Sequence, residues 1–347
     1  MTRALCPLAA VLSLAAALSL AAALSLAAAL PLAAQPKLLV NANLDTRSAG
    51  AGLEAAFKPL LTASPQPSWI GWAVASVRSY NMGCEYVFRD GQATSGQGVV
   101  HLEPPDHAII MMRVDQNAVS RIRYVSPDCE IDAGGVPMHW LTDVQPAQSV
   151  ALLATLVSER EPGSSSAMGA IAMHADASAD QTLDRLAGAQ QPLSIRQRAV
   201  SLLASERGHH GFEMVKDLIA NDSDERIKER AVQSLGSSKD PAALDLLLET
   251  ARRNGNPKLR SQAIGALVRR PEPKILDTLK AAIDDPDVTV QRRAISTLNS
   301  LPDGDGIPLL IQVIKTTKNA EVRKQAMNTL QGSRDPRALA FFEDVLR

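Results

Sequence analysis

A periodic pattern in residues 146–347 constrains the fold of this chain more than any other feature of its sequence. Similar pentapeptides begin at residues 199, 231, 263, 294 and 326, and they read AVSLL, AVQSL, AIGAL, AISTL and AMNTL. Their spacing is 32, 32, 31 and 32 residues, and a further step of 32 residues back reaches the similar AMGAI at residue 167. A period of this length is typical of stacked repeats. The first residues of these peptides, here called the anchors, are Ala167, Ala199, Ala231, Ala263, Ala294 and Ala326.

Each repeat is predicted to be a pair of antiparallel helices. In the last five repeats, Ile, Leu or Val stands four residues before the anchor and Leu stands four residues after it, which places one apolar stripe on a helix. Seven residues before the anchor, four repeats have a residue type that favours helix N-caps, whereas the earlier repeat has Pro192. A further apolar segment precedes each cap and is predicted to be the first helix of the pair. The predicted caps are Asp224, Asn256, Asp287 and Asn319.

The repeated segments resemble a known family. The stretches LGSSKDPAALDLLL (235–248) and AEVRKQAMNTLQGSRDP (320–336) are similar to HEAT repeats, in the short bacterial form also seen in HEAT-like bilin lyases. The resemblance covers residues 177–347 well and 146–176 more loosely. It implies an α-solenoid, because stacked hairpins bury a continuous core that no single hairpin could bury alone. It also implies a scaffold that binds other proteins along an extended surface.

The residues before the repeats have a different composition and pattern, and they are predicted to form a small β domain over 67–145. All three Trp and all three Tyr of the chain fall between residues 69 and 140. Short segments rich in β-branched and aromatic residues predict antiparallel strands at 69–77, 84–89, 98–103, 107–114 and 118–125. In the last segment, Ile122 and Tyr124 are expected on one face, with Arg121, Arg123 and Val125 on the other.

These patterns together predict a mainly α fold, with an α-solenoid of about six HEAT-like helical hairpins over 146–347 preceded by the small antiparallel β domain. Residues 35–66 are predicted to be a linker with a short helix at 51–61. A composition with only 3% aromatic residues agrees with Ala- and Leu-rich helix packing.

The first residues indicate export from the cytoplasm. A basic start, an apolar run over 12–29 and small residues before Gln35 are typical of a secretory signal peptide over 1–34. Cleavage after Ala42 and an uncleaved membrane anchor are the alternatives, since the apolar run is long enough to span a bilayer. The chain is accordingly expected to be periplasmic or secreted, with contact to a membrane only if the N-terminal segment is retained.

Two cysteines remain once the signal peptide is removed, and they predict one disulfide in the β domain. Cys84 and Cys129 would pair in an oxidising compartment. Two free thiols, or half of a metal site, are the alternatives. No His pair lies near these cysteines at a spacing that zinc favours, so we expect no metal site there.

Basic residues recur on the second helices of the repeats and form the candidate partner-binding surface. One interpretation is a groove for a protein or peptide partner with an acidic or extended segment. The other is structural, with these side chains pairing with aspartates in the intervening loops, among them Asp222, Asp224, Asp284, Asp285 and Asp287. The candidate residues are Arg196, Arg198, Lys228, Arg230, Arg260, Arg292, Arg293 and Arg323, with Lys324 beside the last.

No motif in the sequence predicts catalysis, a cofactor or a metal. His209 and His210 are adjacent in sequence and so would not share a helix face, and no Gly-x-Ser-x-Gly or phosphate-loop pattern occurs. The formal net charge of −1 gives no global attraction to nucleic acid. A non-catalytic scaffold is therefore expected, with a HEAT-type enzyme of lyase-like or metal-dependent activity as the alternative. Of Phe341 and Phe342, one is expected to pack inward and the other to be available to a partner.

Overall fold

The computed structural model describes residues 38–77, 86–89, 92–95, 105–270 and 272–346. The predicted signal peptide, the strand expected at 98–103 and Cys84 lie outside these ranges, so export and the disulfide remain predictions. No helix within the described ranges combines the length and the hydrophobicity needed to cross a membrane.

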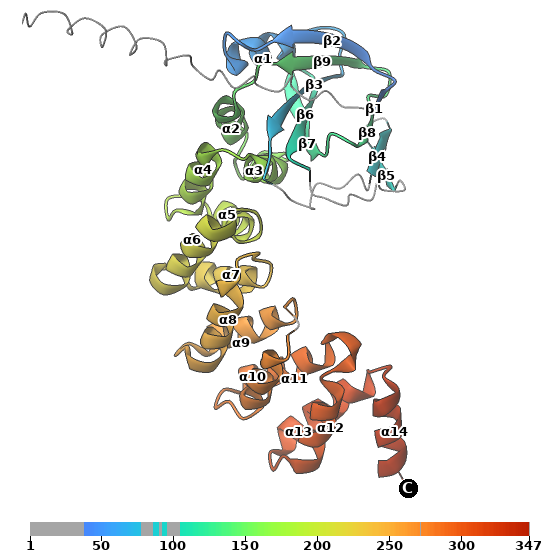
Figure 1. Ribbon diagram of the computed structural model, residues 1–347, viewed down its shortest axis with the longest axis vertical. Helices are drawn as coiled ribbons and strands as arrows, with labels where there is room; N and C mark the ends of the chain where they lie inside the picture. Colours follow the sequence, from blue (N-terminus) through green and yellow to red (C-terminus); the bar gives the residue numbers. More distant parts are fainter. Residues whose placement is uncertain (1–37, 78–85, 90–91, 96–104, 271, 347) are drawn as a thin grey trace, which may run out of the picture. The chain divides into compact units, whose positions relative to one another are not determined.

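A five-stranded sheet forms the main part of the N-terminal region, and the expectation of a small β domain is confirmed (Figure 1). The sheet is mixed, because β9 (Pro137–Thr142) runs parallel to both β2 (Asn43–Ser48) and β3 (Ser68–Ala75), whereas β6 (His107–Asp115) is antiparallel to its two neighbours, β3 and β7 (Ala118–Val125). Two short pairs accompany it, β1 (Leu38–Val40) with β8 (Glu130–Asp132) and β4 (Tyr86–Arg89) with β5 (Gln92–Ser95). In spatial order, the strands of the sheet are β2, β9, β3, β6 and β7.

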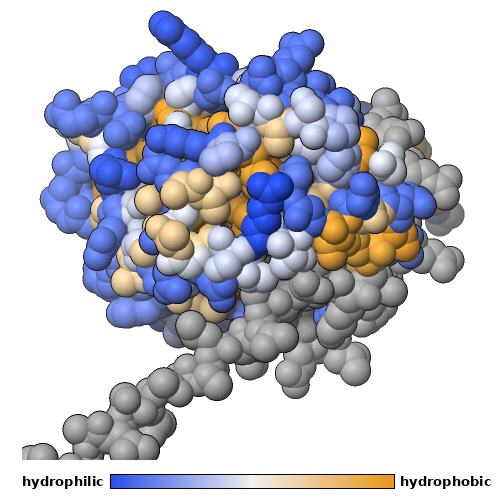
Figure 2. Space-filling view, turned by 90° about the horizontal axis from the view of Figure 1, so that it is seen from above, coloured by the Kyte–Doolittle hydropathy of each residue, from blue (hydrophilic) through white to orange (hydrophobic). Residues whose placement is uncertain are grey.

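The segment 35–66 contributes more than the short helix expected there. It contains α1 (Leu53–Leu61), whose Leu53, Phe57 and Leu60 are buried, and also the edge strand β2. A view of this end of the molecule shows hydrophilic residues over most of the face, with hydrophobic patches between them (Figure 2). The large apolar side chains that are exposed in this segment are Val40 and Leu44.

In the described part of the chain, the remaining helices pair into six hairpins followed by a single helix α14 (Figure 1). Five hairpins correspond to the five complete sequence repeats, and α2 with α3 forms the sixth, which contains the anchor Ala167. The helices are α2 (Pro146–Thr155), α3 (Ser164–Met173), α4 (Ala177–Ala187), α5 (Leu193–Glu206), α6 (Gly208–Asn221), α7 (Glu225–Leu235), α8 (Ala242–Arg253), α9 (Pro257–Leu267), α10 (Lys274–Ile283), α11 (Val288–Asn299), α12 (Ile307–Thr316), α13 (Ala320–Gln331) and α14 (Pro336–Val345).

The predicted caps and anchors occupy the predicted places. Asp224, Asn256, Asp287 and Asn319 are N-caps whose side chains accept a backbone N–H two residues further on, whereas Pro192 precedes α5 without a side-chain cap. All six anchor alanines are fully buried. They lie in the second helix of each hairpin, and each second helix contacts the next one along the chain. Small side chains at this position therefore let neighbouring hairpins approach closely.

One continuous hydrophobic core runs from one face of the sheet through every hairpin to α14. A separate cluster covers the opposite face of the sheet and includes Trp69, Met111, Met138 and Trp140. Because neighbouring hairpins share the long core, each hairpin is stabilised by packing against the next, as expected of a solenoid.

Replacing Ala263 by Leu should destabilise the protein by about 1–3 kcal/mol, because extra methylenes must enter a filled layer. Ala263 in α9 is fully buried at the contact with the second helices of the two neighbouring hairpins. Urea unfolding followed by circular dichroism measures the change. The control is Gln262→Leu, one residue away and partly exposed, and an equal loss for both variants would contradict the packing argument.

The sheet and the first hairpin are joined by close packing and by a buried polar chain. Gly169 in α3 lies so near β7 that a Cβ atom there would be 2.6 Å from the hydroxyl oxygen of Tyr124. Trp72 Nε1 donates to Ser149 Oγ at 2.8 Å, and that hydroxyl is 2.8 Å from His174 Nε2. His174 Nδ1 is 2.8 Å from the carbonyl oxygen of Ala170. Every polar atom in this chain of contacts therefore has a partner.

Candidate interaction surface

The second helices of the hairpins carry the basic residues singled out from the sequence. On α5, α7, α9, α11 and α13, Lys and Arg together outnumber Asp and Glu, whereas the first helices α4, α6, α8, α10, α12 and α14 carry nearly equal numbers of each. The positive charge of the solenoid is therefore concentrated on one layer of helices. The structure divides these cations into two groups with different surroundings.

The first group lies three residues before the anchor and contacts the turns inside the hairpins. Arg260 Nη1 donates to the carbonyl of Asn254 at 2.9 Å, and Arg323 Nη2 donates to the carbonyl of Thr317. In the fourth of these repeats the position is Gln291, whose Nε2 donates to the carbonyl of Asp285 at 2.6 Å. The repeated position thus secures the turn before its own helix.

Arg196 belongs to this group, and the prediction that its side chain is exposed is wrong. Its side chain is buried, with the residue 5% exposed, because it reaches back to the carbonyl of Ala187 at 2.9 Å and pairs with Asp222 in the next hairpin. Asp222 also accepts the backbone N–H of Asp224 at 2.8 Å. Arg196 therefore joins two consecutive hairpins and is not available to a partner.

Arg260 repeats this arrangement two hairpins further on. Its guanidinium makes two hydrogen bonds to the carboxylate of Asp285, at 2.8 and 2.7 Å, and these bonds raise the pKa of Arg260. In the hairpin between those of Arg196 and Arg260, the corresponding residue is Lys228. Its Nζ atom lies 3.5 Å from Oε1 of Glu225 on the same helix. The structural interpretation of the basic row therefore holds for Arg196 and Arg260, whose aspartate partners are Asp222 and Asp285.

The second group lies one or two residues before the anchor and faces outward. Arg198, Arg292 and Arg293 are exposed and Arg230 is partly exposed. Within the described part of the chain, none of these four forms an ion pair. Arg230 Nη1 donates to Gln233 Oε1 at 3.2 Å. The guanidinium of Arg293 lies against Gly265 in the neighbouring second helix. These four residues, here called the outer arginines, carry accessible charge on the second helices α5, α7 and α11.

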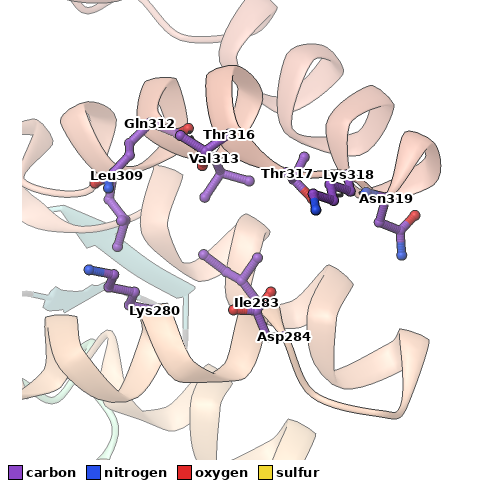
Figure 3. A pocket seen from close by; sticks show the side chains of 10 residues that line it. All are labelled: Lys280, Ile283, Asp284, Leu309, Gln312, Val313, Thr316, Thr317, Lys318 and Asn319. Atoms are coloured by element: carbon purple, nitrogen blue, oxygen red, sulfur yellow. Dashed lines mark hydrogen bonds between the residues drawn. The ribbon is translucent and has the colours of Figure 1, made fainter.

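Two of the described grooves lie elsewhere on the helices. A groove of about 500 Å³ separates α10 from α12, and Figure 3 shows Ile283 and Val313 pointing toward each other at its centre. Lys280, Asp284 and Lys318 also line it. Because most of its lining comes from first helices, it is separate from the outer arginines.

A second groove, of about 430 Å³, lies between α13 and α14 and includes three residues noted in the sequence. Arg323, Lys324 and Phe342 line it together with Met327. Phe341 is buried, with its ring 5.4 Å from that of Phe342, which is partly exposed. One phenylalanine thus packs inward and the other borders a groove, as the sequence indicated.

The adjacent histidines point to different partners. His209 Nδ1 is 2.9 Å from Asp240 Oδ2, whereas His210 Nε2 is 3.1 Å from Asp184. They take part in separate contacts with the following and the preceding hairpin. No group of three or more His, Cys, Asp or Glu among the described residues is arranged to hold a metal ion.

The buried contacts of His174 could not be found from the sequence. Its partner Ser149 lies 25 residues away along the chain, Trp72, which donates to Ser149, lies 77 residues from Ser149, and no local motif joins the three. Burial and, to a smaller extent, the charge of nearby Arg207 lower the pKa of His174 from 6.5 to about 4, although the hydrogen bond to Ala170 acts in the opposite direction. The side chain is therefore neutral at physiological pH and acts in the structure of the domain junction.

Comparison with known proteins agrees with the repeat geometry. A family model described as HEAT repeats matches residues 179–268, 245–305 and 276–347. Residues 179–347 therefore consist of HEAT repeats, and the helical hairpins described above for this part of the chain are those repeats. A comparison with curated proteins finds no match.

Several solved structures contain similar solenoids. Human deoxyhypusine hydroxylase is 19% identical, with 48% of this chain and 66% of that chain covered and a TM-score of 0.32. One chain of the phycocyanin lyase complex from Nostoc sp. is 21% identical, with 44% and 99% covered and a TM-score of 0.35. A designed armadillo repeat protein in complex with a (KR)4 peptide is 18% identical, with 54% and 99% covered and a TM-score of 0.28. This chain thus spans just under two thirds of the human hydroxylase chain, and likenesses this low carry no activity or ligand over to it.

Proposed function

We propose that this protein is a non-catalytic scaffold that binds an extended, acidic segment of a protein partner along the outer arginines. The observation that carries the proposal is the division of the basic residues into two groups. Arg196 and Arg260 form largely buried ion pairs inside the solenoid, whereas Arg198, Arg230, Arg292 and Arg293 form no ion pair with a described residue.

A repeated charge suits an extended partner. The outer arginines come from α5, α7 and α11, which lie in one layer of second helices. A partner chain that runs along this layer would meet outer arginines on α5, α7 and α11, and guanidinium groups bind carboxylates with two parallel hydrogen bonds. With a net charge of −1 for the whole chain, the attraction is local to this layer.

Export and the disulfide belong to the same proposal and rest on the sequence. The N-terminal segment 1–34 supports secretion to the periplasm or beyond, and an oxidising compartment supports pairing of Cys84 with Cys129. Mass spectrometry of the mature chain, with and without reduction, tests both. An intact N-terminus on the exported protein, or two thiols that label without reduction, would contradict these parts.

Reversing three outer arginines should abolish most of the binding to an acidic partner. In the variant Arg198→Glu, Arg230→Glu, Arg293→Glu, affinity for a labelled, extended Glu-rich peptide should fall by at least about tenfold, since each attraction becomes a repulsion. Fluorescence anisotropy measures the affinity at several salt concentrations. Binding to the parent should weaken as salt rises, because exposed charges are screened beyond about 10 Å at 0.1 M salt.

A matched control variant distinguishes a loss of binding caused by the position of the arginines from one caused by the change in net charge. The triple variant Arg252→Glu, Arg253→Glu, Lys280→Glu changes the net charge equally, but it alters exposed residues on the first helices α8 and α10. It should bind like the parent. Equal weakening by both triple variants, or no binding of acidic peptides by the parent, would refute a site on the second helices.

A further inference from the structure

The sheet carries a second concentration of positive charge, on the face that does not pack against the helices. Along β7, Ile122 enters the core shared with the hairpins, whereas Arg121 and Arg123 point to the opposite face, as the alternation of the sequence predicts. On β6, Arg113 lies on this same face as Met111, which belongs to the second hydrophobic cluster. Three arginines from two neighbouring strands thus share one end of this face.

The register places two of these charges directly opposite each other. Arg113 pairs with Arg121 across β6 and β7, and Met111 pairs with Arg123. Side chains that face each other in this way have Cβ atoms about 4.5–5.5 Å apart, and like charges at such positions destabilise a sheet. A β-bulge follows at Arg113 and Val114, a feature that changes the direction of neighbouring side chains.

The surroundings hold these guanidinium groups in place without neutralising all of them. The Arg113 guanidinium carbon lies 5.7 Å from the centre of the Trp69 ring, which is opposite Arg113 on the other side of β6. Arg121 Nη1 is buried and has no hydrogen-bond partner, and neither Arg113 nor Arg121 forms an ion pair with a described residue. Burial lowers the pKa of Arg123, and the nearby charge of Arg121 lowers it to a smaller extent.

We propose that Arg113, Arg121 and Arg123 form a binding site for a phosphate group. A buried, unpartnered guanidinium nitrogen and an unneutralised pair of facing arginines are costly, and a bound anion would offset both costs. A single carboxylate balances one charge and offers two oxygens. A phosphate dianion balances two charges and presents several oxygens to guanidinium groups from two strands, so it fits this cluster better.

Isothermal titration calorimetry and thermal unfolding of the full chain test the site, with inorganic phosphate added to a phosphate-free chloride buffer. Phosphate should bind the parent and raise its melting temperature, because a ligand that binds only the folded state stabilises it. In Arg121→Gln, the affinity for phosphate should fall by about tenfold or more, as expected for the loss of a charge-assisted hydrogen bond. The same variant should melt at a higher temperature than the parent when phosphate is absent, because the facing charge is gone.

The control Arg252→Gln removes an exposed arginine from α8 and should change neither result. Arg113→Gln provides a second test of the cluster should Arg121→Gln fail to fold. A phosphoserine peptide, titrated in parallel, distinguishes a phosphorylated partner from free phosphate by which of the two binds more tightly. The proposal is overturned if the parent gives no heat with either ligand, if chloride at equal ionic strength has the same effect, or if both Gln variants bind phosphate as the parent does.

Discussion

Replacing Arg196 by Ala should destabilise the solenoid by about 3–5 kcal/mol, because it leaves a buried carboxylate without its partner. Asp222 is 7% exposed at its side chain and Arg196 is 6% exposed, so little water can replace the lost contact. The same substitution removes the hydrogen bond to the carbonyl of Ala187, a group near the end of α4. Urea unfolding followed by circular dichroism should show a lower midpoint than for the parent.

A neighbouring arginine supplies the control for this prediction. Arg198→Ala, two residues further along α5, removes an exposed side chain and should change stability by less than about 0.5 kcal/mol. The double variant Arg196→Ala, Asp222→Ala should lose less than the sum of the two single variants, because it leaves no unpaired buried charge. Additive losses, or an equal effect of the two arginine variants, would contradict the structural role assigned to Arg196.

Acid should weaken the protein through His174. The folded-state pKa is about 4, against 6.5 for an unperturbed histidine, so the unfolded chain binds a proton more readily than the folded one. The free energy of unfolding contributed by this group is complete above pH 6.5 and is lost as the pH falls from 6.5 toward 4. The full loss is about 3 kcal/mol, since each unit of pKa difference corresponds to about 1.4 kcal/mol.

The cause is the fixed set of hydrogen bonds at the domain junction. With Nδ1 donating to the carbonyl of Ala170, Nε2 must accept the hydroxyl proton of Ser149, whose oxygen accepts the N–H of Trp72. A second proton, on Nε2, would make Ser149 Oγ accept from both His174 and Trp72, so the hydroxyl proton of Ser149 would lose its acceptor and a charged ring would lie in a buried site. Nearby Arg207 donates to the carbonyl of His174 and adds a further positive charge.

Measurements of urea unfolding between pH 7.5 and 4.5 check the prediction. His174→Gln should be less stable than the parent at pH 7.5 and should show a smaller decline toward pH 4.5, because the titrating group is absent. The comparison variant is His210→Gln, which alters an exposed histidine beside Asp184. If His174→Gln and the parent decline in parallel with falling pH, the junction histidine does not control acid stability.

Local patterns were sufficient to predict the repeats. The caps, the anchors and the flanking apolar residues act within one helix or one turn. Because they recur with a period of about 32 residues, all three can be recognised in the sequence alone. Asp224 and Ala231 illustrate this, because each occupies its predicted place in the structure.

The roles of the basic residues depend on contacts that sequence spacing does not reveal. Arg196 and Arg198 lie two positions apart on α5, yet one is buried and the other exposed. The difference arises from Asp222, which the next hairpin brings to Arg196. The two interpretations of the basic row could therefore be separated only residue by residue.

Local sequence patterns also could not predict the mixed parallel and antiparallel pairing of the sheet. Strand β2, with the sequence NLDTRS, contains few residues that favour strands, and its burial pattern shows five exposed positions of six. It is a strand because β9, more than 90 residues further on, provides parallel hydrogen bonds. Edge strands of this polar kind leave little signal in a single sequence.

The largely buried arginine–aspartate pairs also couple neighbouring hairpins to each other. Arg196 couples the hairpin of α4 and α5 to that of α6 and α7, and Arg260 couples α8 and α9 to α10 and α11. At the two other corresponding boundaries the position holds Lys228 or Gln291, and each contacts its own hairpin. In an array whose stability is a sum of repeats and their interfaces, a largely buried ion pair strengthens the boundary that it crosses. Two hairpins joined by such a pair should therefore open together, so that local unfolding at these boundaries involves twice the unit of the sequence repeat.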